Sequence, residues 1–187
     1  MGANTSNALF YLVSTLFEVY LWLVMLRMIL QFVRADFYNP ISQLVWQLTQ
    51  PLVRPLQAVF PKVGPYDTAA IVVMFAVAVV YVFVSTALLG VVDQVNVLHA
   101  LGYAALKLIV MALNLYTFAL VIQAILSWVG PGVNNPAGSI LWSINEPLLR
   151  PVRRVIPPFS GLDLSPLVVI VLLQFVKLLI PLPGIFR

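Results

Sequence analysis

The sequence contains no cysteine and a single histidine. The absence of cysteine excludes disulfide bridges and thiolate metal sites. The one histidine, His99, stands in a short linker without a second ligand nearby, so we expect a boundary residue and not a metal ligand. No Ser/His/Asp set, no pair of carboxylates on one side of the membrane and no glycine-rich phosphate loop can be assembled from the remaining residues. We therefore expect no enzyme activity and no cofactor.

Charged residues are also scarce. They make up 9% of the 187 residues, against about 25% in soluble domains. Hydrophobic residues make up 62%, and the mean hydropathy is +1.03. The segment from Ala69 to Val92 carries no formal charge, and about 20 such residues cross the hydrocarbon core of a bilayer as a helix. This composition is typical of an integral membrane protein. The N-terminal segment lacks the basic region and cleavage site of a signal peptide.

One stretch of the chain occurs twice, with corresponding residues 96 positions apart. Between residues 39–67 and 135–163, ten of 29 aligned positions are identical without a gap. A fixed period of this kind predicts two copies that fold alike. The repeated positions that we expect to shape the backbone are Asn39, Pro40, Pro51, Pro55 and Asp67, with Asn135, Pro136, Pro147, Pro151 and Asp163 in the second copy.

Each copy is predicted to hold one membrane span, a bent pair of amphipathic helices in the membrane interface, and a second span. The first copy, 1–92, has spans at about 8–33 and 68–92 and interfacial helices at 40–60. The second copy, 100–187, has spans at about 100–129 and 164–180 and interfacial helices at 136–156, after a linker at 93–99. The predicted fold is therefore all-α and polytopic, with four transmembrane helices in two parallel tandem repeats.

The interfacial segments are recognised by their periodicity. Ile41, Leu44, Val45 and Leu48 fall at helical spacing, with polar residues opposite. Asn and Asp are good N-caps, so Asn39 is expected to begin the interfacial region and Asp67 to cap the second span. Proline is expected to end the first helix of each pair and open the next. The alternative is an ordinary amphipathic connector packed on protein.

Two spans in each copy give both copies the same orientation, so both interfacial segments lie on one side. Basic residues concentrate on that side, and those proposed to face lipid or a partner are Arg54, Arg150, Arg153 and Arg154. The positive-inside rule makes this side cytoplasmic and puts both termini outside. The net charge of +4 is accordingly interpreted as topology and contact with anionic lipids, not as nucleic-acid binding.

Polar residues inside the spans are the better functional candidates, because an intramembrane ionisable group is costly and is usually paired or faces water. They are Glu18, Arg27, Asn114, Gln123 and Lys177. Glu18 and Lys177 are predicted at similar depths, so a contact between them is feasible, either as a structural pair or in an ion or proton path. Arg27, near the cytoplasmic end, and Lys107, near the outer end, are expected to snorkel toward water.

The doubled pattern of Asn-Pro, Trp, Pro-Leu-x-Arg-Pro and Asp resembles the YggT family of small bacterial membrane proteins, which also has relatives in plastids. Its most specific residues here are Asp36 to Pro40, Pro51, Arg54-Pro55 and, in the second copy, Asp163, Ser165 and Pro166. The first copy departs from the last motif, with Asp67-Thr68-Ala69-Ala70. The resemblance implies a multi-pass inner-membrane protein linked to osmotic tolerance and ion homeostasis, or to cell division or assembly of membrane complexes. It implies no catalytic residues.

Two functions stay open at this point. In the first, the polar residues of the spans line a conduit for an ion or solute, which would need a homo-oligomer because four helices leave little lumen. In the second, the protein is a scaffold or assembly factor whose basic interfacial helices hold anionic lipid headgroups or a membrane-protein partner. Each cation near an anionic surface contributes about 1 kcal/mol to such binding.

Overall fold

The computed structural model describes residues 3–129, 136–156 and 163–186. Within these ranges the chain forms six α-helices and two short 3-10 helices, and no strand. The helices are α1 (Ala3–Phe32), α2 (Pro40–Gln57), α3 (Thr68–Leu88), η1 (Val92–Gln94), α4 (Val97–Val129), α5 (Pro136–Val155), α6 (Ser165–Leu179) and η2 (Gly184–Phe186). The expected all-α class is confirmed for this part of the chain.

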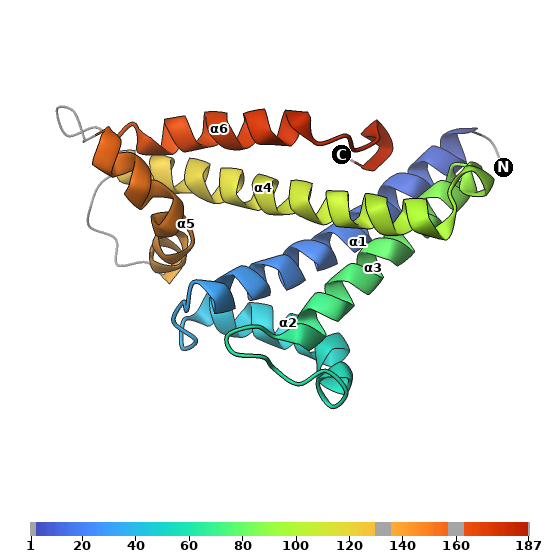
Figure 1. Cartoon of the computed structure of the whole chain (residues 1–187), viewed down its shortest axis with the longest axis horizontal. Helices are drawn as coiled ribbons and strands as arrows, with labels where there is room; N and C mark the ends of the chain where they lie inside the picture. The colour runs from blue at the N-terminus through green and yellow to red at the C-terminus, as the bar shows by residue number, and fades with distance from the viewer. Residues whose placement is uncertain (1–2, 130–135, 157–162, 187) are drawn as a thin grey trace.

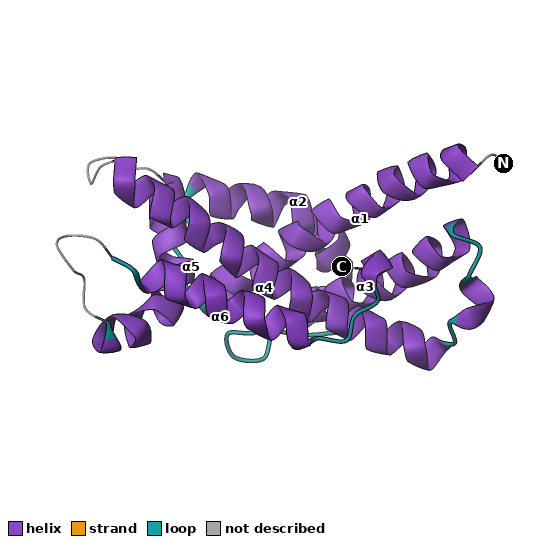
Figure 2. Cartoon of the chain, turned by 90° about the horizontal axis from the view of Figure 1, so that it is seen from above, coloured by secondary structure: helices purple, strands orange, loops and turns teal. Residues whose placement is uncertain are grey.

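The long helices pack as two connected hairpins (Figure 1). α1 packs on α3, α3 packs on α4, and α4 packs on α6. α1 and α4 run in the same direction, and α2 and α5 lie together at the end of the bundle opposite the first turn of α1 (Figures 1 and 2). The main hydrophobic core lies between α1, α3 and α4, while a smaller one formed by Leu120, Leu149 and Val169 joins α4, α5 and α6.

Three helices have the length and composition of membrane spans: Asn7–Phe32, Thr68–Leu88 and Val97–Leu126. α6 is equally apolar but has only 15 residues, a length of about 22 Å at 1.5 Å per residue. This is shorter than the hydrocarbon core of about 30 Å. The helix ends before Pro181 because a residue that precedes proline is pushed out of the α conformation. Three of the four predicted spans are thus confirmed by length.

Each amphipathic segment is one continuous helix, so the predicted break at Pro51 and Pro147 is wrong. Pro40 opens α2 and Pro136 opens α5, whereas the other repeated prolines lie inside the helices, at Pro51, Pro55, Pro147 and Pro151. A proline inside a helix costs about 3 kcal/mol because it removes one hydrogen bond and crowds the preceding turn. Packing of the buried helix faces against the bundle offsets this cost, so the helical conformation persists.

α2 also buries a stripe against the bundle that was not predicted for a helix lying in the membrane interface. The buried residues are Ser42, Val45, Thr49 and Val53, which follow helical spacing along one stripe. The leucines of the predicted apolar face point outward instead, since Leu44 and Leu48 are 54% and 49% exposed. α2 therefore has a protein-facing stripe with two hydroxyl residues and a separate leucine face that is free to meet lipid.

Asn39 connects the two amphipathic helices. Its Oδ1 accepts a hydrogen bond of 2.9 Å from the N–H of Ile41, which is the predicted N-cap of α2. Its Nδ2 donates to the carbonyl of Pro136 at 2.8 Å and to Oγ of Ser139 at 3.0 Å, both in the first turn of α5. One side chain thus caps α2 and fixes α5 beside it. Its counterpart, Asn135, lies outside the described residues.

We predict that Asn39→Ala lowers the free energy of unfolding by about 1–2 kcal/mol, since a lost N-cap costs about 1 kcal/mol and two further hydrogen bonds disappear. Asn39→Ser keeps a capping oxygen but not the amide donor, so it should recover only the capping part. Thermal unfolding of the purified protein in detergent measures both. Equal stability of the alanine variant and the wild type would contradict the assignment.

Candidate functional site

Five polar side chains from α1, α2 and the start of α3 meet at the end of the bundle where α2 lies. This first polar cluster consists of Arg27, Thr49, Gln50, Gln57 and Asp67. Nη2 of Arg27 contacts Oδ2 of Asp67 at 2.8 Å, and Nη1 donates to Oγ1 of Thr49 and Oε1 of Gln50, both at 3.0 Å. The side chains of Arg27 and Asp67 are 3% and 0% exposed. A charge pair at this depth is sheltered from water and needs these hydrogen bonds.

Asp67 carries three roles at once. Its Oδ1 accepts a hydrogen bond from the N–H of Ala70, which confirms the predicted N-cap of α3. Its Oδ2 accepts from both Arg27 and Gln57. Because Asp67 supplies a buried counter-charge, Arg27 turns inward, and the expectation that Arg27 snorkels toward water is wrong.

A second polar cluster occupies the same positions in the second copy. Its members are Gln123, Asn145, Glu146, Arg153 and Asp163, each 96 residues after a member of the first. Nδ2 of Asn145 donates to Oε1 of Gln123 at 2.6 Å. Arg153 pairs with two carboxylates, with Glu146 at 2.7 Å through Nη1 and with Asp163 at 2.8 Å through Nε.

The cation therefore occupies different positions in the two copies. In the first it stands on α1, at Arg27, and in the second it stands on the amphipathic helix, at Arg153, which is 30% exposed. Arg153 consequently does not belong to a free basic stripe as predicted, whereas Arg54, Arg150 and Arg154 are exposed. Burial raises the pKa of Asp163, but hydrogen bonds from Ser165 and Arg153 outweigh it, so this pKa lies below its usual value.

A third polar contact lies nearer the other end of the bundle. Nζ of Lys107, on α4, pairs with Oε1 of Glu18, on α1. The hydroxyl of Tyr81, on α3, donates to the same carboxylate at 3.4 Å, and the Lys107 ammonium lies 4.6 Å from the centre of the Tyr81 ring. Lys107 is 3% exposed, whereas Glu18 is 38% exposed. Lys107 thus turns inward to a counter-charge instead of snorkelling outward.

The partner suggested for Glu18 on depth alone, Lys177, is therefore wrong. α6 packs on α4 and α5, which places Lys177 in the second hairpin, where it is half-buried. No ion pair joins Lys177 to a carboxylate among residues 3–129, 136–156 and 163–186. Asn114, the counterpart of Glu18, is half-buried as well. Within the same described ranges, no three His, Asp or Glu side chains come together as a metal site.

One known protein family matches both halves of this chain. The family described as CCB3/YggT matches residues 6–88 and 102–183. The chain belongs to this family. The two matched segments begin 96 residues apart, which is the offset of the repeated residues and of the two polar clusters.

Relatives in the CCB3/YggT family match along almost the whole chain. An uncharacterized protein of Pseudomonas aeruginosa is 38% identical over 96% of this chain and 90% of its own length. One of Vibrio alginolyticus is 40% identical over 92% and 93%. The uncharacterized protein YggT of Escherichia coli is 36% identical over 92% and 88%. No solved structure matches.

Reasoning from the sequence missed several members of these contacts, namely Thr49, Gln50, Gln57, Tyr81, Lys107, Asn145 and Glu146. One available signal was the 96-residue offset. It aligns Gln57 with Arg153 and Gln50 with Glu146, which indicates that charges change places at polar positions shared by both copies. The offset does not show that Arg27 meets Asp67, since that contact depends on how α1 and α3 are rotated.

We predict that Arg27→Gln or Asp67→Asn alone lowers the free energy of unfolding by about 3–5 kcal/mol, because each leaves an uncompensated buried charge. The double variant should cost less than the sum of the two, and a double-mutant cycle from unfolding in detergent measures the difference. Arg54→Gln removes an exposed arginine of α2 as a control and should change stability by less than about 0.5 kcal/mol. If the stability loss of the double variant equals the sum of the two single losses, Arg27 and Asp67 do not stabilise each other.

Proposed function

We propose that the protein is a non-catalytic scaffold of the bacterial inner membrane, with four spans in two parallel repeats and both termini in the periplasm. Its amphipathic helices would lie on the cytoplasmic face and hold anionic lipid headgroups or a membrane-protein partner. The observation that carries the proposal is the grouping of α2 and α5 at one end of the bundle, with exposed arginines and exposed apolar side chains on both helices.

The exposed side chains suit an interface between water, lipid and protein. Trp46 on α2 and Trp142 on α5 are 39% and 57% exposed, and tryptophan is enriched at the headgroup level of membranes. Arg54, Arg150 and Arg154 are exposed on the same two helices. Basic residues beside large apolar ones are the composition of helices that lie in the membrane surface.

The charges within the bundle support a structural role. Arg27 and Lys107, the two buried cations among the described residues, each have a carboxylate partner inside the protein. An ion pair of this kind fixes helices to one another and leaves little free charge for transport. In the scaffold proposal these pairs keep α1, α3 and α4 together, so that the cytoplasmic face keeps its shape.

A photo-crosslinking side chain at position 142 tests the proposal in cells. We expect an adduct with a protein partner, and we expect its yield to fall when Arg150 and Arg154 are both changed to Glu. Removing the two cations alone, at about 1 kcal/mol each, would weaken binding to an anionic surface by about 30-fold, and the two added carboxylates weaken it further. The same probe at Phe175, an exposed position of α6, is the control. Absence of an adduct from inserted protein, or an adduct indifferent to the charge reversal, would count against the scaffold.

Glu18 favours a second candidate, a conduit for an ion or solute in ion homeostasis. Its carboxylate is 38% exposed and borders a groove of about 520 Å³ together with Thr15, Trp22 and Phe118. A carboxylate at membrane depth is costly unless it meets water or another polar group. The other described lining residues apart from Thr15 are apolar or aromatic. A homo-oligomer that closes over this groove would enclose the Glu18 carboxylate at the oligomer interface.

Potassium and sodium flux into proteoliposomes tests the conduit. Glu18→Gln should change the flux at least severalfold, because it removes the charge that borders the groove. Lys177→Gln removes one charge in the other hairpin and serves as the matched control. Absence of flux from protein shown to be folded and inserted would reject this candidate.

A further inference from the structure

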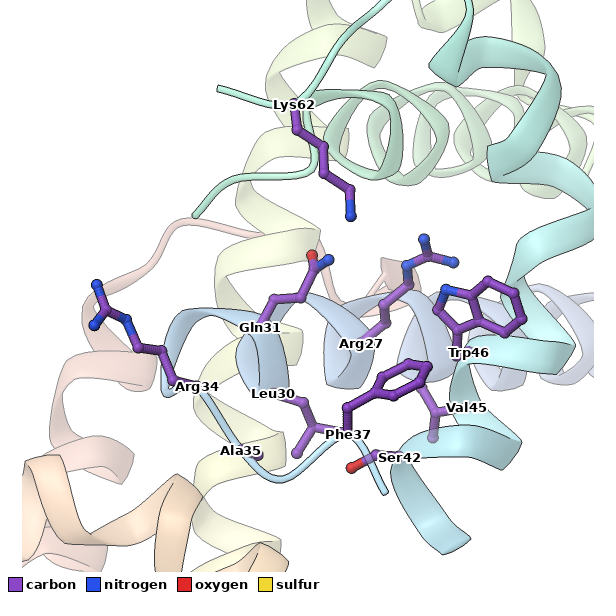
Figure 3. Close-up of a pocket in the computed structure, with 10 residues that line it drawn as sticks. All are labelled: Arg27, Leu30, Gln31, Arg34, Ala35, Phe37, Ser42, Val45, Trp46 and Lys62. Atoms are coloured by element: carbon purple, nitrogen blue, oxygen red, sulfur yellow. The ribbon is translucent and has the colours of Figure 1, made fainter. Parts of the chain in front are cut away.

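A basic pocket lies beside the first polar cluster (Figure 3). It has a volume of about 290 Å³ and is enclosed by the end of α1, the start of α2 and the loop between α2 and α3. Three of its lining residues are basic, namely Arg27, Arg34 and Lys62, and none of the described lining residues is acidic. Phe37 and Trp46 supply an aromatic wall. The pocket therefore combines cations with an apolar side.

The pocket contains buried polar groups without a partner. Arg27 uses both terminal nitrogens within the first polar cluster, but its Nε has no hydrogen-bond partner. Oγ of Ser42, a lining residue that is 8% exposed, is also unpartnered. A buried donor without an acceptor is destabilising. An acceptor bound in the pocket would remove the penalty at Arg27.

Other donors extend into the space beside the Arg27 guanidinium. Figure 3 shows the amine of Lys62 and the amide of Gln31 directed toward this space, with Trp46 on the other side of Arg27. Ser42 lies beyond the Phe37 ring, and Arg34 stands at the edge and is directed away. The arrangement offers an incoming anion several donors in the pocket and an exposed arginine at its rim.

Arg34 has a backbone conformation that favours glycine. Its φ is +54°, and it follows the last turn of α1, where Arg34 N–H bonds Gln31 C=O at 3.1 Å and Ala35 N–H bonds Leu30 C=O at 2.9 Å. This is the Schellman motif, which usually carries glycine at that position. α3 ends in the same motif with Gly90, whose φ is +72°. An arginine at this site places a cation at the pocket in spite of an unfavourable backbone.

The basic residues of the pocket are particular to the first copy. At the corresponding positions 96 residues later, the sequence has Gln123 for Arg27, Gly130 for Arg34 and Pro158 for Lys62. The second copy also carries cations on this side, but at other positions, namely Arg150, Arg153 and Arg154. The positive-inside rule requires basic residues on this side but does not require three of them around one pocket, so their grouping is consistent with a binding site.

We propose that this pocket binds a phosphate group, carried either by an anionic lipid or by a soluble ion. Arg and Lys donors bind phosphate oxygens through charge-assisted hydrogen bonds, and the absence of a described carboxylate in the lining removes repulsion. The aromatic wall accommodates the glycerol backbone of a lipid, while the Arg27 Nε, Gln31 and Lys62 face the phosphate oxygens. The inference goes beyond the scaffold proposal, which assigns anionic lipid to the exposed arginines of α2 and α5, because none of those arginines lines this pocket.

Binding isotherms of the purified full chain in detergent test the site with two probes, inorganic phosphate and short-chain phosphatidic acid, with short-chain phosphatidylcholine as the lipid control. Lys62→Gln should weaken binding by about tenfold, the effect of one charge-assisted hydrogen bond. Arg34→Gly removes a cation at the rim and should weaken binding by a smaller factor. Lys177→Gln removes a cation of α6 that neither lines the pocket nor lies on an amphipathic helix, and it should leave binding unchanged.

Arg34→Gly also guards against a trivial loss of folding. Glycine suits the positive φ, so the unliganded variant should unfold at the same temperature as the wild type or higher. Binding of inorganic phosphate would support a soluble ligand, and binding of phosphatidic acid alone would support a lipid headgroup. No saturable binding of either probe, or equal losses in Lys62→Gln and Lys177→Gln, would overturn the proposal. Crosslinking at position 142 reports on the scaffold separately.

Discussion

The structure of the first hairpin depends on one buried ion pair, Arg27 with Asp67. A charge removed from water must find a counter-charge and hydrogen bonds nearby, and this pair finds them on α2, at Thr49, Gln50 and Gln57. Because Asp67 also caps α3, the end of α1, the middle of α2 and the start of α3 converge on one point. The position of α2 across the bundle end follows from that convergence as much as from its apolar face.

The second hairpin meets the same requirement with the cation in another place. Arg153 stands on the amphipathic helix, close to water, and keeps 30% of its side chain exposed. The interior position on α4 holds the neutral Gln123, which bonds to Asn145. One copy thus places a charge in the bundle interior and the other places it at the edge. The two copies share a plan of polar positions without forming two equal sites.

The parts of the fold that local sequence determines were predictable. Asn39 and Asp67 cap helices through contacts with residues two or three positions away, and the apolar runs identify spans by length. The pairing of Glu18 was not predictable, because it depends on which helix lies beside α1 and on how that helix is rotated. Depth in the membrane favours Lys177 as the partner of Glu18. However, α6, which carries Lys177, packs on α4, and Lys107 on α4 is the cation that contacts Glu18. Likewise, the local propensity of Pro51 and Pro55 predicts a break in α2. The helix continues through both prolines because it is stabilised by packing against the bundle, which local propensity does not include.

The different position of the cation determines what each of the two polar clusters offers to a ligand. In the second polar cluster, Arg153 has Nε and Nη1 occupied by Asp163 and Glu146, and two carboxylates surround one guanidinium. The adjoining pocket, of about 410 Å³, is lined by both Arg153 and Asp163, so an anion there would meet repulsion as well as attraction. In the first cluster Asp67 faces the terminal nitrogens of Arg27 and leaves Nε free. A chain built from two similar halves thereby has unlike chemistry on the two sides of the bundle end that carries α2 and α5, and anion recognition is expected on the first side alone.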